Sequence, residues 1–97
     1  MLADKQLGPK FQLGNIVATP AAMQAIADSG QSPTDFLSRH VRGDWGEVCD
    51  EDKQLNDQAV TDGDRLLSAY RTLKNTRIWI ITEADRSATT LLLPEEY

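Results

Sequence analysis

Apolar residues recur at helical spacing in two short segments of the first half of the chain. In the first segment the apolar side chains share one helical face: Ala22, Met23, Ile26 and Ala27. Thr19 can cap this helix, and Pro20 suits the first turn because its missing N–H would have no partner there anyway. Gly30 can end it in the left-handed conformation. The pattern predicts a short helix between Thr19 and Gly30.

A second helix start follows at Ser32-Pro33-Thr34-Asp35, which combines a cap, a first-turn proline and an acidic residue. The apolar face of this segment consists of Phe36, Leu37, His40 and Val41. A third segment, Asp50 to about Val60, has an acidic first turn but few apolar anchors. It predicts a mostly exposed helix that ends at Asp62-Gly63-Asp64.

The last third of the chain is rich in β-branched, aromatic and aliphatic residues. Three such runs are Arg65 to Leu73, Arg77 to Glu83 and Thr89 to Leu93. Short polar turns separate them, so we expect antiparallel neighbours in a meander. Side chains of the middle run alternate, with Ile78, Ile80 and Thr82 on one face and Trp79, Ile81 and Glu83 on the other. Both faces therefore carry large apolar groups.

These elements predict an α+β fold. An N-terminal strand around Ile16 to Ala18 and two or three short helices are expected to pack on one face of a C-terminal three-stranded antiparallel meander. Residues 1–10 read as a flexible lead-in, and residues 11–97 as a single domain. Trp79, on the other face, is expected to pack under the N-terminal segment or against a second subunit.

Composition narrows the range of partners. The chain carries 10 basic and 15 acidic residues, a net charge of −5, with no basic run longer than two. Duplex DNA binding is therefore disfavoured, because each contacted phosphate requires a cation. The acidic surface either meets a basic partner protein or simply keeps the chain soluble.

The sequence also limits which metal sites, membrane segments and cell compartments are plausible. Cys49 and His40 are the only Cys and His, too few for a closed zinc site, and one thiol cannot form an internal disulfide. No apolar run is long enough to cross a membrane and no secretion signal is visible, so we expect a cytoplasmic protein. Gly-rich phosphate and dinucleotide loops are absent, and no cofactor is expected.

One catalytic arrangement is conceivable from the residues. His40 with Asp44 or Glu47, and a cation such as Arg86, has the composition of a small hydrolase site. The alternative is a histidine that is simply hydrogen-bonded in the core, since His40 lies on the apolar face of its helix.

Two turns are candidates for a binding surface. Trp45, flanked by glycines, either tucks into the core or is presented outward, where tryptophan is a strong interface contact. In the second turn Asp85, Arg86 and Ser87 either close the chain reversal or place Arg86 beside Thr89 and Thr90 to hold an anion.

Three stretches resemble a family of small uncharacterised bacterial proteins found on plasmids and integrated mobile elements: LGNIVATP (13–20), HVRGDWGE (40–47) and IWIITEADRSATTLLLPEEY (78–97). The resemblance implies no established activity. Our leading hypothesis is a non-enzymatic, protein-binding or regulatory accessory protein of such an element. The alternative is a toxin-like hydrolase or ribonuclease, whose helices-then-meander order is similar to that of small microbial ribonucleases. A homodimer held by the Trp79 face is a third possibility.

Overall fold

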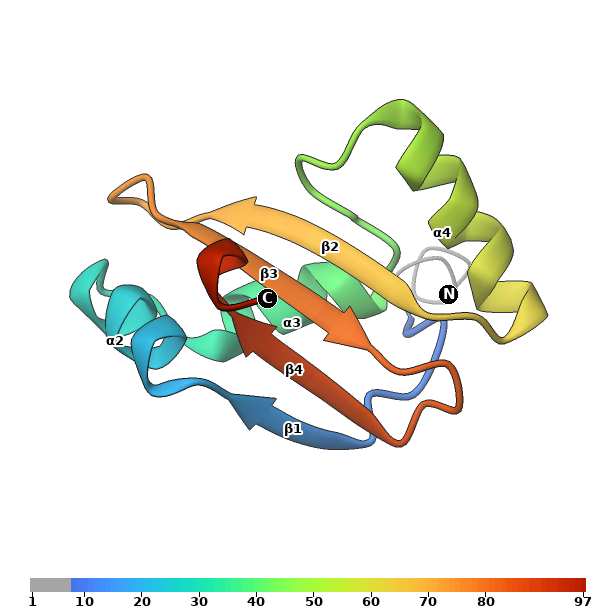
Figure 1. Cartoon of the computed structure of the whole chain (residues 1–97), viewed down its shortest axis with the longest axis horizontal. Coiled ribbons are helices and arrows are strands. Elements are labelled where there is room, and N and C mark those ends of the chain that lie inside the picture. Colours follow the sequence, from blue (N-terminus) through green and yellow to red (C-terminus); the bar gives the residue numbers. More distant parts are fainter. Residues whose placement is uncertain (1–7) are drawn as a thin grey trace.

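The computed structural model describes residues 8–97, which form three helices and a four-stranded mixed sheet (Figure 1). In chain order the elements are β1 (Asn15–Ala18), α2 (Pro20–Asp28), α3 (Pro33–Val41), α4 (Asp50–Asp62), β2 (Leu66–Arg71), β3 (Arg77–Thr82), β4 (Ala88–Leu92) and the 3₁₀ turn η1 (Pro94–Glu96). The strands are ordered β1-β4-β3-β2 across the sheet. The predicted α+β class is confirmed.

The helices begin and end where local chemistry predicts. The Thr19 hydroxyl accepts a hydrogen bond from the Ala22 N–H at 3.1 Å and caps α2. The Asp35 carboxylate accepts from the Ser32 N–H at 2.9 Å at the start of α3. Gly63, with φ of 78°, ends α4 in the left-handed conformation.

The sheet contains one more strand than the predicted meander. Strands β2, β3 and β4 pair antiparallel as expected, but β1 joins them in parallel beside β4, with Ile16 opposite Thr89. Tertiary hydrogen bonds fix this position: the Thr19 N–H donates to the Leu91 carbonyl at 3.0 Å, and the Thr89 hydroxyl donates to the Leu13 carbonyl at 2.7 Å. The N-terminal strand therefore belongs to the sheet.

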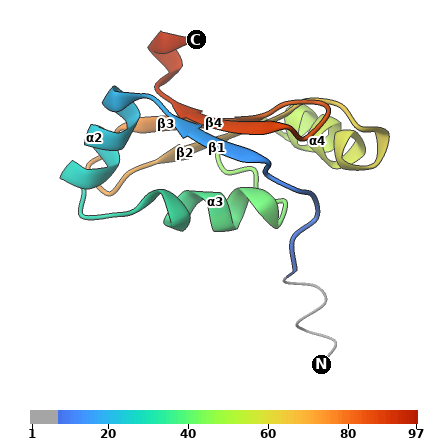
Figure 2. The same ribbon diagram turned by 90° about the horizontal axis from the view of Figure 1, so that it is seen from below.

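Helices α2 and α3 cover one face of the sheet, and η1 lies on the opposite side (Figure 2). The main core lies under these two helices and consists of Ala22, Ile26, Phe36, Leu37, Tyr70, Ile78, Ile80 and Leu91. Helix α4 does not lie over the sheet with α2 and α3, where the sequence predicted it. It lies beside β2 (Figure 1). Its buried Ala59 packs with Trp45 and Leu66 in a second, smaller cluster. We call the face under α2 and α3 the covered face, and the other the open face.

The expected lead-in is only partly described. Residues 1–7 lie outside the described part of the chain. The Lys10 N–H donates to the Val41 carbonyl at 2.8 Å, so the chain is anchored to the end of α3 before β1 begins.

Candidate functional site

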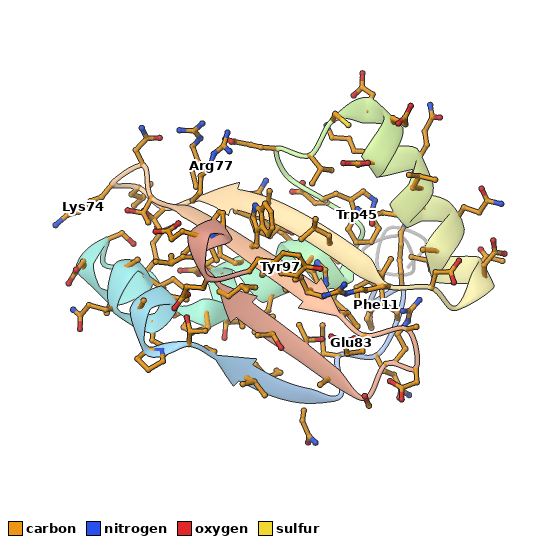
Figure 3. The ribbon with its side chains drawn as sticks, in the orientation of Figure 1. Phe11, Trp45, Lys74, Arg77, Glu83 and Tyr97 are labelled. Atoms are coloured by element: carbon orange, nitrogen blue, oxygen red, sulfur yellow. The ribbon has the colours of Figure 1, made fainter. Side chains whose placement is uncertain are left out.

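Trp45 lies in the core, with 3% of its surface exposed. Its indole N–H donates to the Asp57 carboxylate at 2.9 Å, so burial leaves no polar atom unpaired. Figure 3 shows Trp45 between the sheet and α4. Of the two alternatives, the structure supports the tucked one, and Trp45 offers no exposed contact.

The backbone around Trp45 extends the sheet at its β2 edge. The Ala69 N–H donates to the Trp45 carbonyl at 3.1 Å, and the Glu47 N–H donates to the Ala69 carbonyl at 2.7 Å. Gly46 has a φ of 75°, and a Cβ at this position would collide with the Ala69 carbonyl oxygen. Gly46 therefore serves a structural role, because its missing side chain permits the close approach to β2.

His40 is fully buried in a chain of hydrogen bonds on the covered face. Its Nδ1 lies 2.5 Å from Ser68 Oγ and its Nε2 lies 2.9 Å from Thr82 Oγ1. The Thr82 hydroxyl in turn lies 2.8 Å from the Thr89 hydroxyl, which donates to the Leu13 carbonyl. The chain joins α3, three strands and the segment before β1.

The last bond of this chain fixes the direction of the others. Because Thr89 uses its proton on a carbonyl, it must accept from Thr82, and Thr82 must then accept from His40 Nε2–H. Nδ1 is left as the acceptor for the Ser68 hydroxyl. His40 is thus a neutral Nε2–H tautomer with both ring nitrogens occupied.

Burial lowers the pKa of His40 to about 4, and the positive charge of Arg86 lowers it further in the same direction. At neutral pH the imidazole is uncharged. A side chain with no exposed surface and two engaged nitrogens has no contact with a substrate, so the geometry gives the hydrolase interpretation no support.

The two carboxylates proposed as partners of His40 bind arginines. Asp44 accepts from Arg39 at 2.7 and 3.3 Å, and this hydrogen bond is the main reason that its pKa is lowered. Glu47 accepts from Arg71 at 2.8 Å. Within residues 8–97, neither carboxylate has a hydrogen bond to His40.

Arg86 clamps backbone instead of forming an anion site. Its guanidinium donates to the carbonyls of Asp64 at 2.5 Å, Ala59 at 2.9 Å and Glu83 at 3.1 Å. It also lies over the Phe11 ring, 5.6 Å from the centroid, and Phe11 stacks on Trp45 at 6.1 Å. The Trp45 turn and the Arg86 turn therefore meet through one aromatic side chain.

Of the remaining candidate binding residues, some lie in an exposed turn and others in the sheet. Asp85 is exposed and accepts from the Ser87 N–H at 3.0 Å; hydrogen bonding to Ser87 lowers the pKa of its carboxyl. Thr89 is buried in the His40 chain, whereas Thr90 is half-buried on the open face. The structure favours the chain-reversal interpretation of the Asp85–Ser87 turn over anion binding.

A groove that the sequence patterns did not single out runs over the open face. Its larger hollow, of about 370 Å³, is lined by residues of α4, β2, β3 and the C-terminal end, among them Asp52, Leu55, Leu67, Trp79, Ile81 and Tyr97. A second hollow of about 180 Å³ shares Asp52, Leu67 and Trp79 and adds Glu47, Ala69 and Arg77. We call these two neighbouring hollows, which share Asp52, Leu67 and Trp79, the Trp79 groove.

The Trp79 groove is lined mainly by apolar side chains, with the charged residues Glu47, Asp52, Arg65 and Arg77 among them. Tyr97 meets Trp79 edge to face, with ring centroids 5.7 Å apart, and lies over the sheet in Figure 3. Trp79 therefore packs against Tyr97; the expected packing under the N-terminal segment concerns residues that lie in part outside the described 8–97. Arg65 holds the tyrosine by donating to its hydroxyl at 2.8 Å. Arg77 lies at one end, toward the β2–β3 turn.

Comparison with known proteins finds no matching family model, no matching curated protein and no matching solved structure. In the described part of the chain, no helix is long and apolar enough to cross a membrane. Residues 8–97 also contain no cluster of three or more His, Cys, Asp or Glu side chains suited to a metal ion.

Proposed function

We propose that this chain is a non-enzymatic protein-binding module whose Trp79 groove holds an apolar segment of a partner protein. The observation that carries the proposal is the groove itself, in which one half-buried tryptophan lines both hollows. Tryptophan in a partly dry pocket is the side chain most often responsible for binding energy at protein interfaces.

Exposed apolar groups beside the groove support this role. Leu55 of α4 is 59% exposed and Tyr97 is 67% exposed, and both line the larger hollow. Exposed apolar side chains that surround a hollow lower the free energy of a complex when a partner removes them from water. Arg77 and Asp52 give the groove charges of both signs, which suit a peptide with mixed charges.

The biological setting extends the same proposal. The sequence resemblance to small proteins of plasmids and integrated mobile elements is what supports an accessory role in such an element. The single cysteine, in a chain without another thiol to pair with, supports a cytoplasmic location.

A displayed library of random dodecapeptides, selected on the purified protein, tests the proposal. We expect enriched peptides to share a large apolar anchor and to lose at least about tenfold in affinity when Trp79 becomes alanine. Fluorescence anisotropy of labelled peptides measures the affinities. Thr90→Ala, on the same face but outside the residues that line the groove, is the matched control.

Two results would contradict the proposal. One is enrichment of peptides that bind Trp79→Ala as tightly as the parent protein. The other is a selection that yields no binding peptide at all. Circular dichroism of Trp79→Ala must match the parent, so that any loss of affinity reports the groove and not unfolding.

A further inference from the structure

The two outer edges of the sheet differ in how their backbone groups are used. At the β2 edge, Trp45 and Glu47 occupy the N–H and carbonyl of Ala69. The Asn56 side chain occupies Leu67 in the same way, donating to its carbonyl at 2.8 Å and accepting from its N–H at 3.3 Å. This edge is closed along its centre.

The β1 edge is open. The N–H groups of Asn15 and Thr19 donate to β4 and its flank, so by alternation the N–H and carbonyl groups of Ile16 and Ala18 point away from the sheet. Within the described residues these outward groups have no hydrogen-bond partner. No helix lies beyond β1 in Figure 1, and the side chains of Ile16 and Val17 are 53% and 51% exposed.

β1 itself carries no charge; the Glu96 carboxylate lies just past its end, where it accepts from the Thr19 hydroxyl at 2.7 Å. The chain has 25 charged residues among 97, yet none lies between Phe11 and Ala27, a stretch that contains all of β1 and most of α2. Natural edge strands are usually protected from pairing by short length, by lysine or proline, or by a bulge; β1 is short, with four residues, but has none of the other features. β1 contains no lysine and no proline, and its ladder with β4 runs in unbroken register.

We propose that β1 pairs antiparallel with β1 of a second copy of this chain. The outward groups lie symmetrically about Val17, so a two-fold axis through that residue places Ile16 opposite Ala18 of the second copy, with Val17 facing its own counterpart. Four backbone hydrogen bonds form across the axis. The result is one eight-stranded sheet.

An uncharged strand is the best partner for uncharged β1, and β1 of a second copy is such a strand. Each chain carries a net charge of −5, so two copies repel wherever acidic surfaces meet. Antiparallel pairing brings β1 of one copy against β1 of the other, and neither strand carries a charge. Since one short strand pair holds the complex, we expect a weak dimer that forms in proportion to concentration.

Disulfide trapping tests the register. In a Cys49→Ser background, Val17→Cys places two thiols on a non-hydrogen-bonded antiparallel pair with Cα atoms about 4.5 Å apart, within disulfide range. The matched control Asn15→Cys, on the same strand and face, places its thiols more than about 12 Å apart. We expect rapid dimer cross-linking of Val17→Cys only. Equal or slower cross-linking than for Asn15→Cys overturns the proposal.

Sedimentation velocity tests the dimer itself. The parent protein is expected to sediment at twice the mass of its 10.8 kDa chain as concentration rises, and Val17→Lys to remain monomeric because two lysines then face each other across the axis. Val17→Thr, which keeps β-branching, should still dimerise. A parent protein that stays monomeric at its highest soluble concentration overturns the proposal, and so does a dimer that survives Val17→Lys. Trp79→Ala should dimerise normally, so failure of the groove is distinguishable from failure of the edge.

Discussion

The two faces of the sheet differ: the covered face buries polar side chains, whereas the open face exposes apolar ones. The covered face buries four polar side chains, His40, Ser68, Thr82 and Thr89, in one chain of hydrogen bonds. The open face instead leaves Trp79 half-buried beside exposed Leu55 and Tyr97. Among the described residues no buried side-chain nitrogen or oxygen is unpaired, so the polar core is fully satisfied. Stability is concentrated on one face, which leaves the other available for a partner.

The largest expected effect is a difference in stability loss between two alanine variants of β3, one on each face of the sheet. Ile80→Ala should lower the free energy of unfolding by about 4 kcal/mol, because it leaves an enclosed cavity on the covered face. Ile81→Ala should cost about 2 kcal/mol, because Ile81 borders the Trp79 groove and water can fill the space. Urea unfolding measures both. Equal losses would mean that the open face is packed as tightly as the covered one.

The next effect concerns pH and belongs to the covered face alone. The pKa of His40 falls from 6.5 to about 4 on folding, so the unfolded chain binds the proton first as pH decreases. The free energy of unfolding should therefore fall by about 3 kcal/mol between pH 7 and pH 4 and change no further through this residue below that. The lowered carboxyl pKa values of Asp44, Asp85 and Glu96 add to this loss only below about pH 5, at the acidic end of the window.

The sole histidine makes this measurable directly. NMR of the imidazole Cε1–H should give a single titration with a midpoint near pH 4, accompanied by the loss of stability seen in urea unfolding. His40→Gln should remove most of the fall in the free energy of unfolding between pH 7 and about pH 5. A midpoint near 6.5 in the folded protein would show that the imidazole is accessible and would revive a chemical role.

The smallest effect compares two threonines. Thr82→Val removes the acceptor of the His40 Nε2–H and should cost about 2 kcal/mol, because a buried donor is left unpaired. Thr90→Val, on the open face of the next strand, should change stability by less than about 0.5 kcal/mol. Thermal unfolding of the two variants measures the difference. Similar values would indicate that water replaces Thr82 in the chain.

Local chemistry was sufficient to predict the helices but not the sheet edge. Thr19-Pro20 and Gly63 act through bonds to residues at most four positions away, so their meaning is visible in the sequence. The pairing of β1 with β4 joins Asn15 to Ala88, and no short-range pattern carries its direction. The sequence therefore predicted that a strand forms near Ile16, but not that β1 joins the sheet or where it lies in the strand order.

The candidate site shows the same limit. The alternation along β3 indicated that Trp79 faces away from the helices, but the groove also needs Leu55 from α4 and Tyr97 from the chain end. Nothing near Tyr97 in the sequence indicates a contact with Trp79. Trp45 and Arg86 drew attention as unusual turns, and both proved to be structural through Phe11.

The parallel partnership of β1 and β4 also governs when the protein can fold during synthesis. β1 leaves the ribosome early, but its partner strand comprises residues 88–92 and is made more than 65 residues later. Until then β1 has no neighbour, and the Leu13 carbonyl has no Thr89 hydroxyl to bind. Pairings so distant in sequence slow folding, because the loop between them must close first. A nascent chain stalled before residue 88 should therefore hold its helices only loosely and be cut readily by protease, whereas the released chain resists.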